Sequence, residues 1–325
     1  MKIINLSIVF VMMLSPVIFG LNLKESRVAK AQQLTTQYKM ALTAAVQDAS
    51  FSLLQNVEQE GESYYFSQKF AKTNNDEALK TFFHSLYMNF GIDQNPVAQG
   101  VLQTYIPVIS IVDYDGFFIY AFDDYTNSNG MIETKHLPRP KIPFEYTDGQ
   151  GNIISFTLDE WVVAYEASTQ KWREGMRSEV AVELPSISLL QNPAEFERER
   201  RQVILSKIQE QLEYYINRHN TYAKRYGITY TFTLPVLSQE DWENTIDDIG
   251  IISFIQGYPL GGGYEFNNFA LGGSRIAKKP VIIGTTIGGV KYYYREDCGL
   301  SHPVEEILYS RKEAASKGYF PLKCD

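Results

Sequence analysis

The side chains that most often carry acid–base or nucleophilic chemistry are few in this chain and lie far apart. The four histidines, His84, His136, His219 and His302, fall in different predicted elements. General acid–base catalysis needs a histidine or a pair of carboxylates held beside the reacting group. The chain also lacks the Gly-x-Ser-x-Gly and His-Glu-x-x-His patterns of common hydrolases. We therefore lean towards a protein that is not an enzyme, and we predict no cofactor and no metal.

Four aspartates surround the first predicted hairpin, and their carboxylates are the kind of ligand that calcium prefers. They are Asp113, Asp115, Asp123 and Asp124. Their spacing does not match the loop of an EF-hand. We interpret Asp113 to Gly116 as a turn between two apolar runs, with the other aspartates on its flank.

A glycine-rich stretch with interspersed aromatic residues covers residues 260–273. It lacks the Gly-Lys-Ser/Thr ending of a phosphate-binding loop and the spacing of a dinucleotide-binding loop. A surface loop is the simpler interpretation, and the alternative is a site for an anion or a glycan. The residues expected to contact such a ligand are Gln256, Tyr258, Tyr264, Phe266 and Phe269.

The composition is that of a globular protein with a substantial core. The chain has 325 residues, of which 44% are apolar and 21% charged. Its net charge of -8 excludes a general nucleic-acid binder, because phosphate backbones require a basic surface.

The segment from Ile3 to Leu21 is predominantly apolar, carries no charge and approaches the length of about 20 residues that spans a bilayer. We favour an uncleaved membrane anchor, and the alternatives are a cleaved signal peptide and a buried core helix. Lys24, Arg27 and Lys30 follow the segment, whereas Lys2 alone precedes it, so a count of flanking positive charges would keep the body in the cytoplasm.

Apolar residues at three- and four-residue spacing predict a helix from Glu25 to about Asn56. Its apolar face is narrow and rich in alanine, which permits close packing on another helix or on a sheet. Either this face covers the protein's own core, or it binds the subunits of an assembly. The residues expected to make the subunit contact are Leu34, Tyr38, Leu42, Ala45 and Ala49.

The first 60 residues or so, an apolar span followed by a continuing helix, resemble the start of pilin-like and TadE-like proteins. That resemblance implies a membrane-anchored chain with an exported sheet behind the helix.

The last 35 residues or so resemble the small metal-binding module of Ada-type proteins. The resemblance rests on Tyr293–Cys298, on Ser310 to Ala314 and on Gly318–Cys324. Tyr294 stands where the family has histidine and Leu322 stands where it has a cysteine, so the resemblance implies the fold without the metal.

In place of the metal, we expect a disulfide between Cys298 and Cys324, with free thiols or a bound metal as the alternatives. The chain has only two cysteines, and a disulfide between them favours export. This argument opposes the count of flanking positive charges. We therefore expect a body held at the cell surface by the membrane anchor.

Together these signals predict an α+β fold. A membrane span continues into a long amphipathic helix, followed by a mixed or antiparallel sheet with a second long helix from Asn192 to about Arg225 and a small C-terminal module. The expected divisions are 1–23 (anchor or signal segment), 24–92 (helical), 93–185 (β-rich), 186–290 (α/β) and 291–325 (C-terminal module).

The functional hypothesis is a non-enzymatic, membrane-anchored component of an exported bacterial assembly, such as a pilus-like, secretion or conjugation apparatus. Its expected partners are the membrane and protein subunits. The alternatives are a surface module that binds glycan, peptide or cell wall, and an exported hydrolase with a dispersed site.

Overall fold

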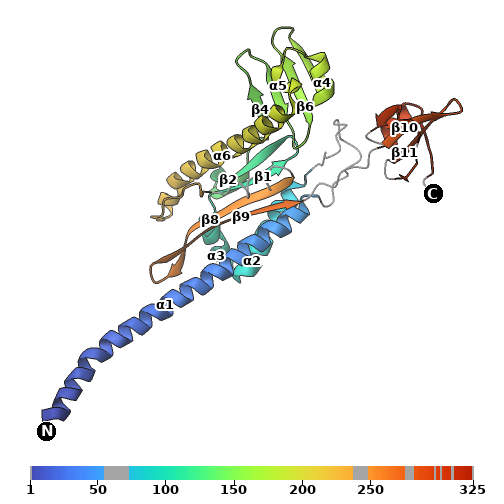
Figure 1. Cartoon of the computed structure of the whole chain (residues 1–325). Coiled ribbons are helices and arrows are strands. Elements are labelled where there is room, and N and C mark those ends of the chain that lie inside the picture. The colour runs from blue at the N-terminus through green and yellow to red at the C-terminus, as the bar shows by residue number, and fades with distance from the viewer. Residues whose placement is uncertain are drawn as a thin grey trace.

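The structure is a computed structural model that describes residues 2–54, 73–236, 248–274, 282–295, 298–300, 302–308 and 311–323. Side chains at 2–9, 11, 16–18, 20–22 and 311–312 are not described. Its main body is a large antiparallel sheet with long helices on both sides (Figure 1).

The N-terminal helix α1, Lys2–Ser52, is one continuous element of 51 residues. Figure 1 shows its first turns extending beyond the sheet, whereas its last turns lie against the sheet. Among the helices that the structure describes, none has the length and apolar character needed to cross a membrane. The membrane span expected at Ile3 to Leu21 is therefore corrected: these residues are the first turns of a helix that runs on through Lys24 and Arg27.

Nine strands form the main sheet, in the order β7-β6-β5-β4-β2-β1-β8-β9, with β3 also paired to β2. The strands are β1 Val108–Asp113, β2 Gly116–Thr126, β3 Ile132–Pro138, β4 Ile142–Thr147, β5 Ile153–Phe156, β6 Trp161–Glu166, β7 Lys171–Met176, β8 Ile249–Gly261 and β9 Tyr264–Ser274. Every pairing is antiparallel. Because β1 pairs with both β2 and β8, strands from the 93–185 and 186–290 stretches share one sheet.

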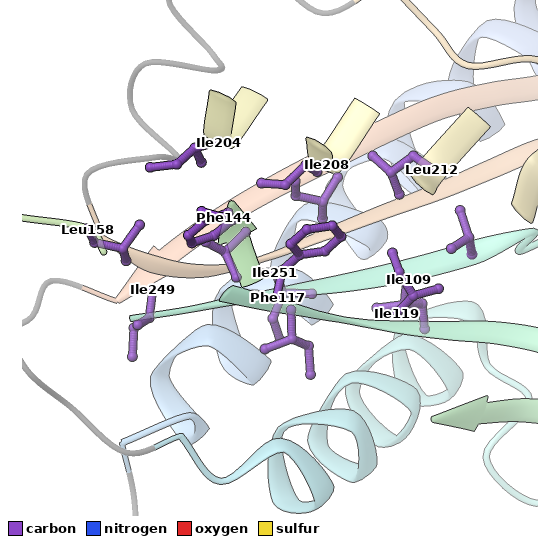
Figure 2. Close-up of a cluster of buried hydrophobic side chains, with 14 of the residues drawn as sticks. Ile109, Phe117, Ile119, Phe144, Leu158, Ile204, Ile208, Leu212, Ile249 and Ile251 are labelled. Carbon is purple, nitrogen blue, oxygen red and sulfur yellow. The ribbon is translucent and has the colours of Figure 1, made fainter. Parts of the chain in front are cut away.

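The helix α6, Pro193–Arg225, lies along one side of this sheet. Asn192 caps it by accepting hydrogen bonds from the backbone N–H groups of Ala194 and Glu195, as the sequence predicts. Its apolar residues recur at helical spacing, so Ile204, Ile208 and Leu212 all point into the core above the strands (Figure 2). The short helices α4, Arg177–Glu183, and α5, Ser188–Gln191, connect β7 to α6.

The opposite side is covered by α1 together with α2, Asn75–Phe90, and the short α3, Pro96–Gln103. Asn74 caps α2, and the helix ends at Gly91 in the left-handed conformation. The core therefore has two layers, one between α6 and the sheet and one between the sheet and α1 with α2.

The alanine-rich face of α1 lies inside this core, so it is not the subunit contact that we considered. Leu42, Ala45 and Ala49 are fully buried, and Leu34 and Tyr38 are partly buried. The small side chains let the helix approach β9 closely at Gly272. A Cβ atom at Gly272 would lie 2.7 Å from Ser50 Oγ and 2.7 Å from Val46 Cγ1.

In Ile228 to Leu234, isoleucine, tyrosine, phenylalanine and leucine alternate with threonine, a pattern that predicts a strand, but the segment forms no strand pairing. Side chains form hydrogen bonds with its backbone groups instead. The Asn220 side chain bonds both the N–H and the C=O of Phe232, at 2.8 and 3.0 Å. The short helix expected after Ser238 lies outside the described residues.

The C-terminal residues form a separate four-stranded sheet in the order β12-β10-β11-β13. Its elements are β10 Ile282–Ile287, β11 Val290–Arg295, β12 Glu306–Leu308, α8 Arg311–Ser316 and β13 Phe320–Pro321. Ile282, Leu308, Ala314 and Tyr319 make its small core.

The close approach of α1 to β9 gives a test of the fold. We expect Gly272→Ala to lower the free energy of unfolding by about 1–3 kcal/mol, because the added methyl group forces the helix away from the strand. Gly273→Ala is the matched control, since the atom nearest to its new Cβ would be Ile249 O at 3.6 Å. Equal denaturation midpoints for the two variants in urea would contradict this account of the interface.

Candidate functional site

The five residues singled out in and beside the glycine-rich stretch all lie on the β8–β9 hairpin. Tyr258 on β8 faces Phe266 on β9 in the strand register. Gly261, Gly262 and Gly263 make the turn between them, each with positive φ. The stretch is therefore a hairpin with a glycine turn rather than the surface loop that we expected.

Gln256 is buried and serves as a clamp on the backbone of Thr233. Its side-chain amide donates to Thr233 O at 2.7 Å, and its oxygen accepts from Thr233 N–H at 3.1 Å. Both ends of the amide are thereby occupied within the protein, so the residue holds the 228–236 segment in place of a strand pairing.

Tyr258 and Phe266 belong to an aromatic cluster that seats α1 and α2 on the hairpin. The Tyr38 ring of α1 stacks on Phe90 of α2 at 4.3 Å between centroids. Tyr258 contacts Tyr38 at 5.6 Å and Tyr105 at 5.3 Å, and Phe266 contacts Tyr38 at 5.7 Å. Burial raises the pKa of the Tyr258 hydroxyl. These rings are committed to packing between elements of the same chain.

The two remaining candidates do not complete an open site with the others. Tyr264 is 36% exposed beside the glycine turn, and Phe269 is half-buried against the main core further along β9. The structure thus spreads the five residues over a buried clamp, an aromatic cluster and a hairpin tip.

The aspartates of the first hairpin are neutralised by basic side chains. Lys141 contacts Asp115 and lies 2.7 Å from Asp113, whose pKa is raised by burial despite this lysine. Burial opposes the charge on Lys141, but both carboxylates together raise its pKa. The result is a turn pinned by one shared cation, in agreement with the structural interpretation.

Asp123 sits in a second, larger ionic cluster that ties α6 to β2. Its carboxylate contacts Arg139 and Tyr222 and accepts a hydrogen bond from Arg218 at 2.7 Å. Burial alone would raise its pKa, but these donors hold it below its usual value. Asp124 is paired with Arg225 at 2.8 Å. Across the described residues, no group of three or more potential ligands could hold a metal ion.

Two buried histidines were not recognised as a pair from the sequence. His136 on β3 and His219 on α6 contact the same ring, Phe122, at 5.3 and 5.5 Å between centroids. Burial lowers the pKa of His136 to about 3 and that of His219 to about 4. They stand 83 positions apart in the chain, and local sequence carries no signal that would bring them together.

The disulfide that we expected in the C-terminal unit is described at one end only, where Cys298 is not a free thiol. Cys298 is described, but Cys324 lies outside the described residues, so the structure does not define the bridge. Tyr294, which stands where the Ada-type module has a histidine, is buried and donates a hydrogen bond to the His302 carbonyl at 3.2 Å. Its hydroxyl serves a structural contact with the backbone at that position.

A shallow groove of about 570 Å³ runs between α1 and α2. Its polar walls are satisfied within the protein, because Ser85 donates to Asp48 at 2.6 Å and Ser52 to Thr81 at 3.1 Å.

The described part of α1 also exposes large apolar side chains along its projecting turns. Phe10 is 63% exposed, Met12 69%, Met13 67% and Phe19 64%. Among the α1 residues whose side chains are described, Ala31 is the first that is buried. Between Phe10 and Leu23 the helix therefore presents apolar side chains that the body does not cover.

Comparison with known proteins finds no matching family model, no matching curated protein and no matching solved structure.

Two substitutions distinguish a structural role of Gln256 from a role in ligand binding. We expect Gln256→Met, which keeps the size but removes both hydrogen bonds, to lower the free energy of unfolding by about 1–3 kcal/mol. Tyr264→Ser, at the exposed hairpin tip, should change it by less than about 0.5 kcal/mol. Urea denaturation of both variants measures the difference, and an unchanged Gln256→Met protein would refute the clamp.

The Asp113–Gly116 turn should be indifferent to calcium. In Asp115→Asn the salt bridge between Lys141 and Asp113 remains, so we expect the melting temperature to change little, with or without calcium. Differential scanning calorimetry of wild type and variant checks this. A calcium-dependent rise of the melting temperature in wild type that the variant loses would identify a cation site instead.

Proposed function

We propose that this protein is a non-catalytic subunit of a larger protein assembly and that the projecting part of α1 joins it to its neighbours. We name this part, Phe10–Leu23, the projecting segment. The observation that carries the proposal is its exposed apolar surface, on a helix whose later turns are firmly seated in the core.

The apolar side chains of the projecting segment occupy more than one side of the helix. Successive residues are about 100° apart around an α-helix. Phe10 and Met12 therefore lie on nearly opposite sides, while Met12 and Phe19, seven residues apart, share one side. A helix that is apolar all round belongs in apolar surroundings rather than against a single flat surface. A bundle of several such helices supplies those surroundings.

The neighbours that we propose are further copies of this chain. Each copy brings the same uncharged apolar helix, so the segments can cover one another, while Lys24 and Arg27 would mark the edge of the bundle. The subunit contact thus moves from the alanine-rich face, which is buried in the protein's own core, to the turns that precede it.

The alternatives have less support. The side chains considered for a glycan site are largely occupied in packing, as described above. The carboxylates that a hydrolase would need are paired with arginine or lysine at Asp113 and Asp123. The proposed location outside the cytoplasm, at the cell surface, remains a prediction from the sequence.

Site-specific crosslinking in cells that produce the protein would test the contact. A photo-crosslinking amino acid at Phe19 should link the chain to a second copy, identified by its mass and by peptide sequencing. The same amino acid at Met40, which is 61% exposed on the part of α1 seated on the body, is the matched control and should give few links.

Phe10→Asp combined with Met13→Asp should abolish the crosslink at Phe19 while leaving the fold intact by circular dichroism. Crosslinks from Phe19 that reach lipid alone, or none at all, would contradict the proposal. Equal yields from Phe19 and Met40 would also contradict it.

A further inference from the structure

The buried histidine pair clasps one short loop from two sides. His136 Nε2 lies 2.8 Å from the carbonyl oxygen of Ile106, and His219 Nε2 lies 2.9 Å from that of Thr104. Both carbonyls belong to the residues that join α3 to β1. Residues on β3 and on α6 therefore converge on the same three-residue loop, 104–106.

These contacts fix the protonation state of each imidazole at neutral pH. A carbonyl oxygen can only accept, so each Nε2 must carry the hydrogen and donate it. Each Nδ1 is then the bare nitrogen, and it is buried without a hydrogen-bond partner in both residues. A second proton would have to enter at Nδ1, in a place that offers it no acceptor.

The groups that face the pair are mostly aromatic. Phe83 of α2 lies against His136 at 5.3 Å, Phe122 of β2 contacts both imidazoles, and Phe232 lies against His219 at 4.6 Å. The two imidazoles also disfavour each other's charge, since a positive His219 would lower the pKa of His136 further.

Several ionisable groups on the same elements are bonded to other partners. They are Tyr87 on α2, bonded to Gln103; Asp123 on β2, bonded to Arg139, Arg218 and Tyr222; Lys135 on β3, over the Tyr125 ring; and Arg218 and Tyr222 on α6. The Asp123 cluster keeps its charge in mild acid because its pKa is already depressed. The ties between α6 and β2 therefore persist when the histidines take up protons.

We propose that His136 and His219 form an acid-sensitive joint that holds loop 104–106 at neutral pH and releases it in mild acid. Release of the loop would loosen the packing of α1, because Tyr105 in this loop packs on Tyr258, a member of the aromatic cluster that seats α1. The joint thereby links acidity to the seating of the helix.

The pH window follows from the direction of the shifts. The folded protein resists protonation, with pKa values of about 3 and about 4, whereas a released imidazole has its ordinary value of 6.5. The stability contributed by the neutral pair is complete above pH 6.5 and is lost as the pH falls towards 4. Between these pH values, each histidine raises the equilibrium constant for opening the loop by up to about tenfold for each pH unit of acidification.

Hydrogen exchange of the native protein tests the joint directly. The amides of Thr104, Tyr105 and Ile106 are bonded to the carbonyls of Val101, Leu102 and Gln103, so they report opening of the loop. We expect their protection, corrected for the intrinsic effect of pH, to fall at least tenfold between pH 7 and pH 5. Amides of Leu42 to Ala49 in α1, bonded within the helix, should lose much less.

Two variants and one titration complete the experiment. In His136→Gln with His219→Gln the pH effect on loop 104–106 should disappear, and in His84→Gln, which changes an exposed histidine on α2, it should remain. Should the double variant fail to fold, an NMR titration of wild type decides. Imidazole signals of His136 and His219 that titrate near pH 6.5 while loop 104–106 stays protected would overturn the proposal. Equal loss of protection throughout the molecule would also overturn it.

Discussion

The fold depends on the burial of one short strand, β1. Its six residues are all buried, and it pairs with β2 on one edge and with β8 on the other. A strand in this position must have every backbone group bonded, because water cannot reach it. β1 therefore joins β2, which directly follows it in the chain, to β8, which begins about 140 residues later. The two helical layers can then pack on a single continuous sheet.

The helices use different physical means to hold to this sheet. The seated part of α1 relies on close approach, with Val46 and Ser50 against Gly272 and a cluster of aromatic rings at one end. The C-terminal half of α6 relies on polar anchors, namely the Asp123 cluster and His219. Close apolar contact is insensitive to pH, and the Asp123 cluster keeps its charge in mild acid because its pKa is depressed. The hydrogen bond from His219 to loop 104–106 is therefore the anchor of α6 on which mild acid would act.

The contrast between the two parts of α1 bears on function. One helix continues without interruption from turns whose apolar face is buried in the core to a segment that the body leaves open. An apolar helix surface of this kind is stable in water when other apolar groups cover it. In our proposal a neighbouring subunit supplies these apolar groups. Because the helix is continuous, it would fix the position of the assembly contact relative to the sheet.

The sequence by itself determined the features that depend on neighbouring residues. The Asn192-Pro193 start of α6, the Asp113–Gly116 turn and the apolar character of the projecting segment were all predictable from local patterns. The membrane span that we predicted from that apolar character is contradicted by the structure. Of the predicted disulfide, only Cys298 is among the described residues. The pairing order, by contrast, was beyond local patterns, because β8 reaches β1 across more than a hundred residues.

The tertiary structure alone decided what the candidate residues do. Gln256 and Tyr258 have the same types and spacing whether they line a binding surface or hold a chain segment, and only the position of Thr233 and Tyr38 distinguishes the two. His136 and His219 became a pair because β3 and α6 converge on one loop. Local sequence fixes which backbone conformations are favoured, but contacts between distant segments follow from how the apolar faces are buried together, and that is a property of the whole chain.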